Sequence, residues 1–380
     1  MAKLGDVCTV VSGTTPKTSC PEYWDGDINW VTPAELNDDS DIIYESQRKL
    51  TKKAVMESGL KSFPQGTVLL SSRAPIGKVA IAGVEMYCNQ GFKNLICSDA
   101  IYNRYLYHFL KSKTQYLNLL GRGATFKEVS KGIVENIEIP LPSISEQRCI
   151  ASILDKVTDL IAKRRTQLEK LDLLVKSRFV EMFGTERDFS KWNIAKVEDV
   201  AEVCVGVVIK PSQYYAEIGI KAFRSLNIGV MNVKNSEWVY FSEEGHLKNA
   251  KSTVHEGDIL VVRSGAPGTA CVVTKEYDGC NAVDIIIARP NSKKINSVFL
   301  AAFTNYPHGM NQIQKGTGGA AQQHFNVGQY KTMQIILPPL DLQNEFALYF
   351  HQTETTKSNI QKSLETLETL KKALMQEYFG

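Results

Sequence analysis

A long heptad-patterned segment dominates the second quarter of this chain of 380 residues. Between residues 145 and 184, mostly apolar side chains recur at alternating steps of four and three, and charged side chains fill the positions between them. This spacing is the a/d seam of a coiled-coil helix, which is apolar along one narrow stripe. The seam positions are Ile150, Leu154, Val157, Ile161, Arg164, Leu168, Leu171, Val175, Arg178 and Met182.

The same pattern returns 196 residues further along the chain. The flanking residues match without a gap, since Gln147 corresponds to Gln343 and the pair 183–184 to the pair 379–380. A long helix with one apolar seam needs a partner, so we expect the two helices to form an intramolecular coiled coil. The second seam comprises Phe346, Phe350, Thr353, Lys357, Ile360, Leu364, Leu367, Lys371, Leu374 and Tyr378.

The segment before each helix repeats as well. Lys3-Leu-Gly-Asp-Val7 corresponds to Lys196-Val-Glu-Asp-Val200, and Cys88-Asn89 corresponds to Cys280-Asn281. Short apolar runs bounded by Gly, Pro or Asn predict strands, and amphipathic helices are expected over 103–120 and near 297–314. We therefore predict an α/β (α+β) fold with two modules and two long helices. The predicted ranges are module one at 1–143, helix one at 144–184, module two at 185–339 and helix two at 340–380.

The order of these parts predicts how they are arranged. A compact module usually has its ends close together, so helix two should run back along helix one, antiparallel to it. The modules would then be related by a pseudo-two-fold axis at the two ends of a rod about 57 Å long. At the start of helix one, Ser143 with Glu146, or Ser145 alone, can cap the free amides.

Composition restricts the class of protein only loosely. The net charge of +3 permits nucleic-acid binding but does not by itself indicate it. The sequence has neither the roughly 18 consecutive apolar residues of a membrane span nor the features of a signal peptide, so a cytoplasmic location is expected. The eight cysteines form no C-x-x-C pair, and we expect reduced thiols and no metal site.

Motifs for catalysis are missing from the sequence. There is no phosphate-binding G-x-x-x-x-G-K-[ST] loop, and no G-x-G-x-x-G that opens a helix after a strand. Neither a Glu-x-Lys triplet nor an Asn-Pro-Pro or Asp-Pro-Pro sequence occurs, and the six histidines give no i, i+4 metal pair. We expect no catalytic residues, and a chain that is not an enzyme alone.

Several turns and loops mix basic, amide and aromatic side chains, which suit contacts to nucleic acid. Arg and Lys neutralise phosphates, Arg reads guanine edges, and Gln or Asn reads adenine edges. Ordinary solvated loops have the same composition, and composition alone favours that interpretation over a binding site. The candidates in module one are Thr15, Lys17, Asn29, Arg73, Lys78, Gln90, Lys93, Arg122, Thr125 and Lys127. Those in module two are Lys210, Arg224, Arg263, Lys315, Gln322, Gln323 and His324.

These motifs resemble the specificity subunit of type I restriction–modification enzymes. In module one the resemblance lies in Ser12-Gly-Thr-Thr-Pro-Lys17, Leu70-Ser-Ser-Arg-Ala-Pro-Ile-Gly77, Asn89-Gln-Gly-Phe-Lys93 and Gly123-Ala-Thr-Phe126, followed by the Pro-rich entry to the helix. The twofold repeat of module and helix extends it over the whole chain. Module two matches less closely, because Gly318–Phe325 departs from the Gly-x-Thr-Phe pattern.

The resemblance implies a function for each part. Each module would be a target-recognition domain that reads one half of an interrupted DNA sequence. The helices would set the spacing and dock two methyltransferase subunits, which use S-adenosylmethionine to methylate adenine. A restriction subunit that uses ATP and Mg²⁺ would join them, and this chain itself would bind no cofactor. A rod of about 57 Å corresponds to about 17 base pairs, which leaves room for two half-sites and an unread spacer.

Two other functions remain open at this stage. The chain could serve a related fused nuclease–methyltransferase (type IIB-like) system, since the difference lies in the partner. It could also be a scaffold whose modules bind proteins or glycans instead of DNA. Both restriction–modification functions require binding to duplex DNA that weakens steeply with salt, because phosphate contacts release counterions. A scaffold for proteins or glycans would show no such binding.

Overall fold

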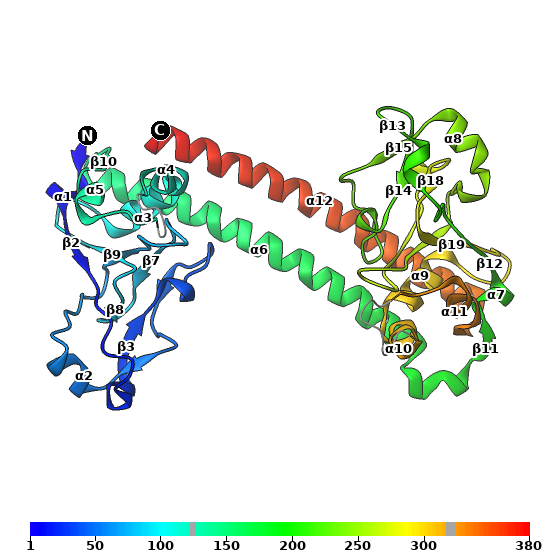
Figure 1. Ribbon diagram of the computed structural model, residues 1–380, viewed down its shortest axis with the longest axis horizontal. Coiled ribbons are helices and arrows are strands. Elements are labelled where there is room, and N and C mark those ends of the chain that lie inside the picture. Colours follow the sequence, from blue (N-terminus) through cyan, green and yellow to red (C-terminus); the bar gives the residue numbers. More distant parts are fainter. Residues whose placement is uncertain (122–126, 317–323) are drawn as a thin grey trace. The chain divides into compact units, whose positions relative to one another are not determined.

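The computed structural model describes residues 1–121, 127–316 and 324–380. The chain divides into two compact units, Met1–Arg165 with Lys362–Gly380 and Thr166–Gln361. Each unit contains one module and one part of each of the two long helices, α6 (Ile144–Phe183) and α12 (Leu340–Phe379) (Figure 1). The predicted fold class, two tandem α/β modules that are each followed by a long helix, is confirmed.

The module of the first unit is built on two larger sheets and a short strand pair. One sheet has five strands in the order β2-β9-β6-β7-β4, antiparallel except for the parallel pair β7–β4. The other has the order β5-β3-β8, and β1 pairs with β10. The strands are β1 Ala2–Lys3, β2 Cys8–Ser12, β3 Trp24–Val31, β4 Ile42–Ile43, β5 Lys49–Leu50, β6 Val68–Leu70, β7 Val79–Ala82, β8 Tyr87–Cys88, β9 Lys93–Cys97 and β10 Glu138–Ile139.

Helix α3 covers the five-stranded sheet on the side of the long helices, whereas α2 packs against β3 of the other sheet. α3 buries a run from Tyr105 to Leu110 in the same core cluster as Val68, Leu70 and Leu95 of the sheet. The predicted helix over 103–120 is interrupted at Lys113, whose amide hydrogen-bonds two carbonyls in a tightened last turn. The helices are α1 Leu4–Val7, α2 Lys52–Glu57, α3 Asn103–Ser112, α4 Thr114–Leu120 and α5 Lys131–Glu135.

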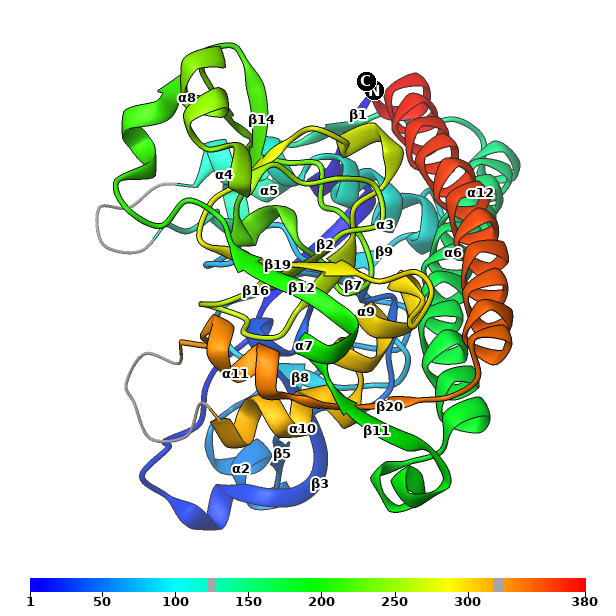
Figure 2. The same ribbon diagram turned by 90° about the vertical axis from the view of Figure 1, so that its right-hand side faces the viewer.

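The module of the second unit repeats this plan. A four-stranded antiparallel sheet has the order β12-β19-β16-β17, a second sheet has the order β13-β15-β14-β18, and β11 pairs with β20. Figure 2 shows this module facing the viewer. Its strands are β11 Asn193–Lys196, β12 Ala201–Val205, β13 Tyr215–Ala216, β14 Ile220–Phe223, β15 Val239–Phe241, β16 Ile259–Val262, β17 Ala270–Val272, β18 Asn281–Ala282, β19 Ile285–Pro290 and β20 Gln334–Leu337.

The helix predicted near 297–314 is also divided in two. Tyr306 is extended and Pro307 follows it, and a proline disfavours the helical conformation in the residue before it. The sequence pattern predicted one continuous helix because apolar residues continue on both sides of this position. The helices of this module are α7 Val197–Val200, α8 Glu243–Lys248, α9 Ser297–Asn305, α10 Pro307–Gly316 and α11 Val327–Thr332.

The two long helices pack side by side and antiparallel within each unit. In the first unit Arg165 of α6 forms an ion pair with Glu368 of α12, and Leu154 lies in one cluster with Phe379. In the second unit Asp172 pairs with Lys357 at 2.6 Å, nearer the start of α12. Every predicted seam position of both helices is buried or half-buried, as a coiled-coil seam requires.

The start of α6 is capped as the sequence predicted. The amide of Ser143 donates to Glu146 Oε2 at 2.9 Å, and the amide of Glu146 donates back to Ser143 Oγ at 3.3 Å. This reciprocal pair is a capping box, which satisfies two amides that the helix cannot pair itself. At the other ends of the long helices, Lys113 Nζ donates to the carbonyl of Phe379 and His308 Nε2 donates to that of Gly184.

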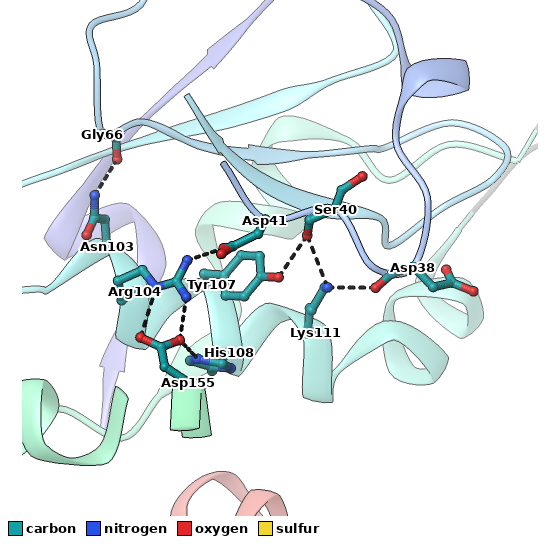
Figure 3. Close-up of polar contacts among 10 residues, drawn as sticks. All are labelled: Asp38, Ser40, Asp41, Gly66, Asn103, Arg104, Tyr107, His108, Lys111 and Asp155. Carbon is teal, nitrogen blue, oxygen red and sulfur yellow. Dashed lines mark hydrogen bonds and ion pairs between the residues drawn. The ribbon is translucent and has the colours of Figure 1, made fainter. Parts of the chain in front are cut away.

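A polar network joins α6 to the first module (Figure 3). The carboxylate of Asp155 accepts hydrogen bonds from two guanidinium nitrogens of Arg104 and, at 2.7 Å, from Nε2 of His108. Arg104 also pairs with Asp41, so one α3 arginine holds both α6 and the acidic segment 38–41. Tyr107 and Lys111 bind carbonyls of the same segment.

No helix in the described parts of the chain is both long enough and apolar enough to cross a membrane. All eight cysteines lie in those parts and carry free thiols; Cys149 is exposed, and the other seven are buried or half-buried.

Candidate nucleic-acid interface

Four separate segments meet at the ends of strands β2, β6 and β9 in the first unit. The segment after β2 is joined to the end of β8 by the bond from the Thr14 amide to the Cys88 carbonyl (3.0 Å). The segment after β6 is joined to the turn before β9 by the bond from the Ser72 amide to the Gly91 carbonyl (2.8 Å). The amide of Val129 donates to the carbonyl of Ser72, which brings in the fourth segment, at 127–129.

Glu128 is at the centre of this junction. Its Oε2 accepts a hydrogen bond from Nε of Arg73, and its Oε1 accepts one from Nζ of Lys93, both at 2.9 Å. Burial acts to raise the pKa of Glu128, but the hydrogen bonds from Lys93 and Arg73 outweigh it and hold the pKa below its ordinary value. Lys93 is buried and also donates to Ser72 Oγ, so it holds the junction from inside the module.

Further members of the predicted set lie in the segments that meet at this junction. Thr15 Oγ1 donates to the side-chain oxygen of Gln90, which ties the segment after β2 to the turn before β9. Gln90, Lys17 and Lys127 are exposed to solvent. The structure thus brings Thr15, Arg73 and Gln90, from three distant stretches of sequence, into neighbouring segments, as a composite binding surface requires.

Asn29 and Lys78 are held by contacts within the module. The side-chain amide of Asn29 donates to the carbonyl of Tyr44 at 3.2 Å and accepts a hydrogen bond from the backbone amide of Ser46 at 3.1 Å. Lys78 Nζ donates to the carbonyl of Leu36 at 2.7 Å. These bonds give both side chains a structural task, and their contacts to nucleic acid remain predictions.

The second unit builds the same junction from equivalent segments. The Val207 amide donates to the Ala282 carbonyl (2.9 Å), and the Asp284 amide donates to the Val207 carbonyl (3.1 Å). The Phe325 amide donates to the carbonyl of Arg263 (2.8 Å), as Val129 does to Ser72 in the first unit. The shared backbone pattern therefore places Arg263 where Ser72 lies in the first unit.

The side chains at this second junction differ from those at the first. Arg263 is buried, and its two terminal nitrogens contact the carboxylate of Asp284 and Nε2 of His324. An arginine can only donate, so this nitrogen of His324 is the acceptor. The other ring nitrogen, Nδ1, then carries the proton and donates to Ser264 Oγ at 2.7 Å. Arg263 and His324 are therefore engaged with each other.

The remaining described candidates of module two are distributed around the module. Lys210 is exposed and has a left-handed backbone with φ of 45°. Arg224 donates through Nη2 to the carbonyl of Glu237. Lys315 is exposed in the last turn of α10. Four further candidates, Arg122, Thr125, Gln322 and Gln323, lie outside the described residues.

Sequence reasoning missed Glu128 and Asp284, because a search for DNA contacts selects basic and amide side chains. The repeat contained the signal that could have found the first of them. Adding 196 to 128 gives His324, which was a candidate, and the two residues form equivalent β-bridges, with Arg73 and Ser264 respectively. Within the described ranges, no group of three or more His, Cys, Asp or Glu side chains is placed to hold a metal ion.

Comparison with known proteins identifies the family. The family model of the type I restriction modification DNA specificity domain matches residues 1–171 and 190–369. The chain belongs to this family. Both copies of the repeat are therefore specificity domains, and the resemblance seen in the sequence motifs is confirmed.

Relatives that match nearly all of this chain are known. The MjaIX specificity subunit of a type I restriction enzyme from Methanocaldococcus jannaschii is 31% identical over 98% of this chain and 90% of its own length. The MjaVIII specificity subunit from the same organism is 25% identical over 99% of this chain and 90% of its own. The solved S subunit from M. genitalium is 15% identical, has a TM-score of 0.60, and covers 100% of this chain and 95% of its own, which shows a common fold.

Proposed function

We propose that this chain is the DNA-specificity subunit of a type I restriction–modification system, and that its two modules read the two halves of an interrupted target. The observation that carries the proposal is the duplicated junction: equivalent segments meet in both modules and bring basic and hydroxyl side chains together. Phosphate neutralisation by the exposed Lys17, Lys127, Lys210 and Lys315 would supply affinity, and side chains such as Gln90 would supply sequence discrimination.

The catalytic steps belong to partner subunits in this proposal. Two methyltransferase subunits would bind the long helices and use S-adenosylmethionine to methylate adenine, and restriction subunits would use ATP and Mg²⁺. The whole complex would act in the cytoplasm. Apolar side chains that remain exposed on the long helices support such docking, because exposed apolar surface is typical of sites that bind another protein. They are Leu160, Leu173, Leu174, Leu348 and Leu370.

The long helices would also set the distance between the half-sites. A continuous helix of 40 residues, the length of α6 and of α12, extends about 60 Å. At 3.4 Å per base pair this corresponds to about 18 base pairs, which accommodates two half-sites and an unread spacer.

The test is a map of methylated adenines. This chain is expressed with its cognate methyltransferase subunit in a host that lacks adenine methylation, and the genome is sequenced by a single-molecule method that detects the modified base. We expect one two-part motif with a fixed unread gap. A continuous motif would mean that one module alone reads DNA. An intact complex that leaves the genome unmethylated would contradict the proposal.

A further inference from the structure

In the part of the chain that the structure describes, the side chain of Arg73 is held by one of its three nitrogens. Nε donates to Glu128 Oε2 at 2.9 Å, and the second oxygen of the same carboxylate is fixed by Lys93. The Lys93 side chain is only 7% exposed, so this carboxylate is anchored to the interior of the module. Arg73 is therefore oriented by a rigid group.

The terminal nitrogens of Arg73 remain available. Its side chain is 43% exposed, and neither Nη1 nor Nη2 donates a hydrogen bond to any residue that the structure describes. A guanidinium that is fixed through Nε keeps a two-pronged edge of parallel N–H donors at its end. That edge matches the O6 and N7 acceptors of guanine in the major groove, whereas a phosphate contact needs no such orientation.

The second module provides a contrast at its own junction. Both terminal nitrogens of Arg263 are engaged, by Asp284 and His324, and its side chain is only 11% exposed. An arginine bound in this way stabilises the module and has no free edge for a base. Of the two junction arginines, Arg73 is the one whose Nε is fixed while its terminal nitrogens have no partner in the described ranges.

We propose that Arg73 reads a guanine in the half-site of the first module, and that Glu128 is the positioning residue that orients it, with Lys93 anchoring the carboxylate. This inference rests on the proposed function, because it requires that the first module binds duplex DNA. It also gives Lys93 a role behind the interface, in place of the direct DNA contact that the sequence suggested.

The test uses 7-deazaguanine, which replaces the N7 acceptor by C–H and leaves base pairing intact. Duplexes with the mapped target carry this base at one guanine at a time, and binding to the assembled methyltransferase complex is measured. The loss of one hydrogen bond from a charged donor should weaken binding about tenfold at a single guanine. In a complex with Arg73→Ala the same substitution should have no effect.

Two further variants separate positioning from charge. Arg73→Lys keeps the charge but cannot form the fork, so it should bind like Arg73→Ala and show no sensitivity to 7-deazaguanine. Glu128→Gln keeps Arg73 but weakens the contact that orients its guanidinium. Binding should then become less sensitive to 7-deazaguanine at the same guanine. If that variant melts early because Lys93 is left without its counter-charge, the double variant Lys93→Met/Glu128→Gln removes the buried charge as well and is used in its place.

Lys127→Ala is the matched control, since this exposed neighbour should contact phosphate only. It should weaken binding to every duplex alike and leave the tenfold effect at the single guanine unchanged. The inference is overturned if the target holds no guanine whose effect depends on Arg73, or if Arg73→Ala weakens all duplexes equally, as Lys127→Ala does. In either case the wild-type complex still binds and methylates its target, whereas failure of the proposed function would abolish both.

Discussion

Gln147 and Gln343 have the same task in the two units. Each is fully buried near the start of a long helix, and each amide oxygen accepts a backbone N–H, from Tyr102 at 2.8 Å and from Asn296 at 2.9 Å respectively. Each amide nitrogen donates to a proline carbonyl, of Pro142 or Pro338. One side chain therefore ties the long helix to its module in both units, which is why glutamine stands at both positions of the repeat.

Replacing either glutamine by leucine should destabilise its own unit by about 2 kcal/mol, because buried backbone groups would lose their partners. The measurement is denaturant unfolding of the Gln147→Leu and Gln343→Leu variants. Gln352→Leu, at an exposed position of α12, is the control and should change the free energy of unfolding by less than about 0.5 kcal/mol. Equal losses in all three variants would contradict this role.

Asp155 should be important for stability in the first unit, because its carboxylate is shared by Arg104 and His108. An amide at this position would present N–H donors to groups that themselves donate. We expect Asp155→Asn to cost about 2 kcal/mol of unfolding free energy. Asp159→Asn, one turn later and paired with the exposed Lys163, should cost no more than about 0.5 kcal/mol. Thermal and denaturant unfolding of both variants measures these two losses.

His108 should make stability depend on pH. Burial holds the pKa of His108 below its ordinary value, and Arg104 and Lys371 act in the same direction, while Asp155 opposes them. The unfolded chain therefore takes up a proton at a higher pH than the folded chain does. Stability should be constant above about pH 7 and fall as the pH drops through about 6.5, the unfolded value.

The comparison that isolates this effect is His108→Gln against His351→Gln, since His351 is exposed on α12. Unfolding free energies are measured at several pH values between 8 and 5. The first variant should show a flatter profile than the wild-type protein, and the second should follow the wild type. A wild-type profile that rises as the pH falls through this range would contradict the assignment.

Lys17 should contribute affinity without sequence preference, as a side chain that meets phosphate does. Lys17→Ala should weaken binding of the assembled complex equally to target and non-target duplexes. The slope of log affinity against log salt should become shallower by about one, since one fewer counterion is released. Binding isotherms at several salt concentrations give both quantities, and a loss confined to the target duplex would show that Lys17 reads a base.

The helix pair should determine the length of the unread spacer. Residues 162–168 and 362–368 are each one heptad, and they contain the ion pair between Arg165 and Glu368. Deleting both heptads keeps the apolar seam in phase and shortens each helix by about 10 Å, or about three base pairs of DNA. The methylation map of this variant should show both half-sites unchanged with a shorter gap. The same gap as in the wild type would refute the spacing role.

The sequence by itself determined the plan of this protein. Heptad periodicity and the repeat at 196 residues predicted two long helices, their buried seams and two similar modules, because helix burial follows from spacing along the chain. The Ser143–Glu146 capping box could be predicted for the same reason. The break at Lys113 was missed because amphipathic spacing continues through it, and the signal at Pro307 was outweighed by the apolar residues on either side.

Only the tertiary structure decided which polar side chains are free to act. Arg73 and Arg263 look alike in the sequence, yet among the described residues one is held through Nε alone while the other is bound at both terminal nitrogens. Glu128 lies 55 residues from Arg73 along the chain, and Asp284 and His324 lie 21 and 61 residues from Arg263. Contacts at such separations are set by strand pairing and loop closure, and local sequence pattern carries no record of them.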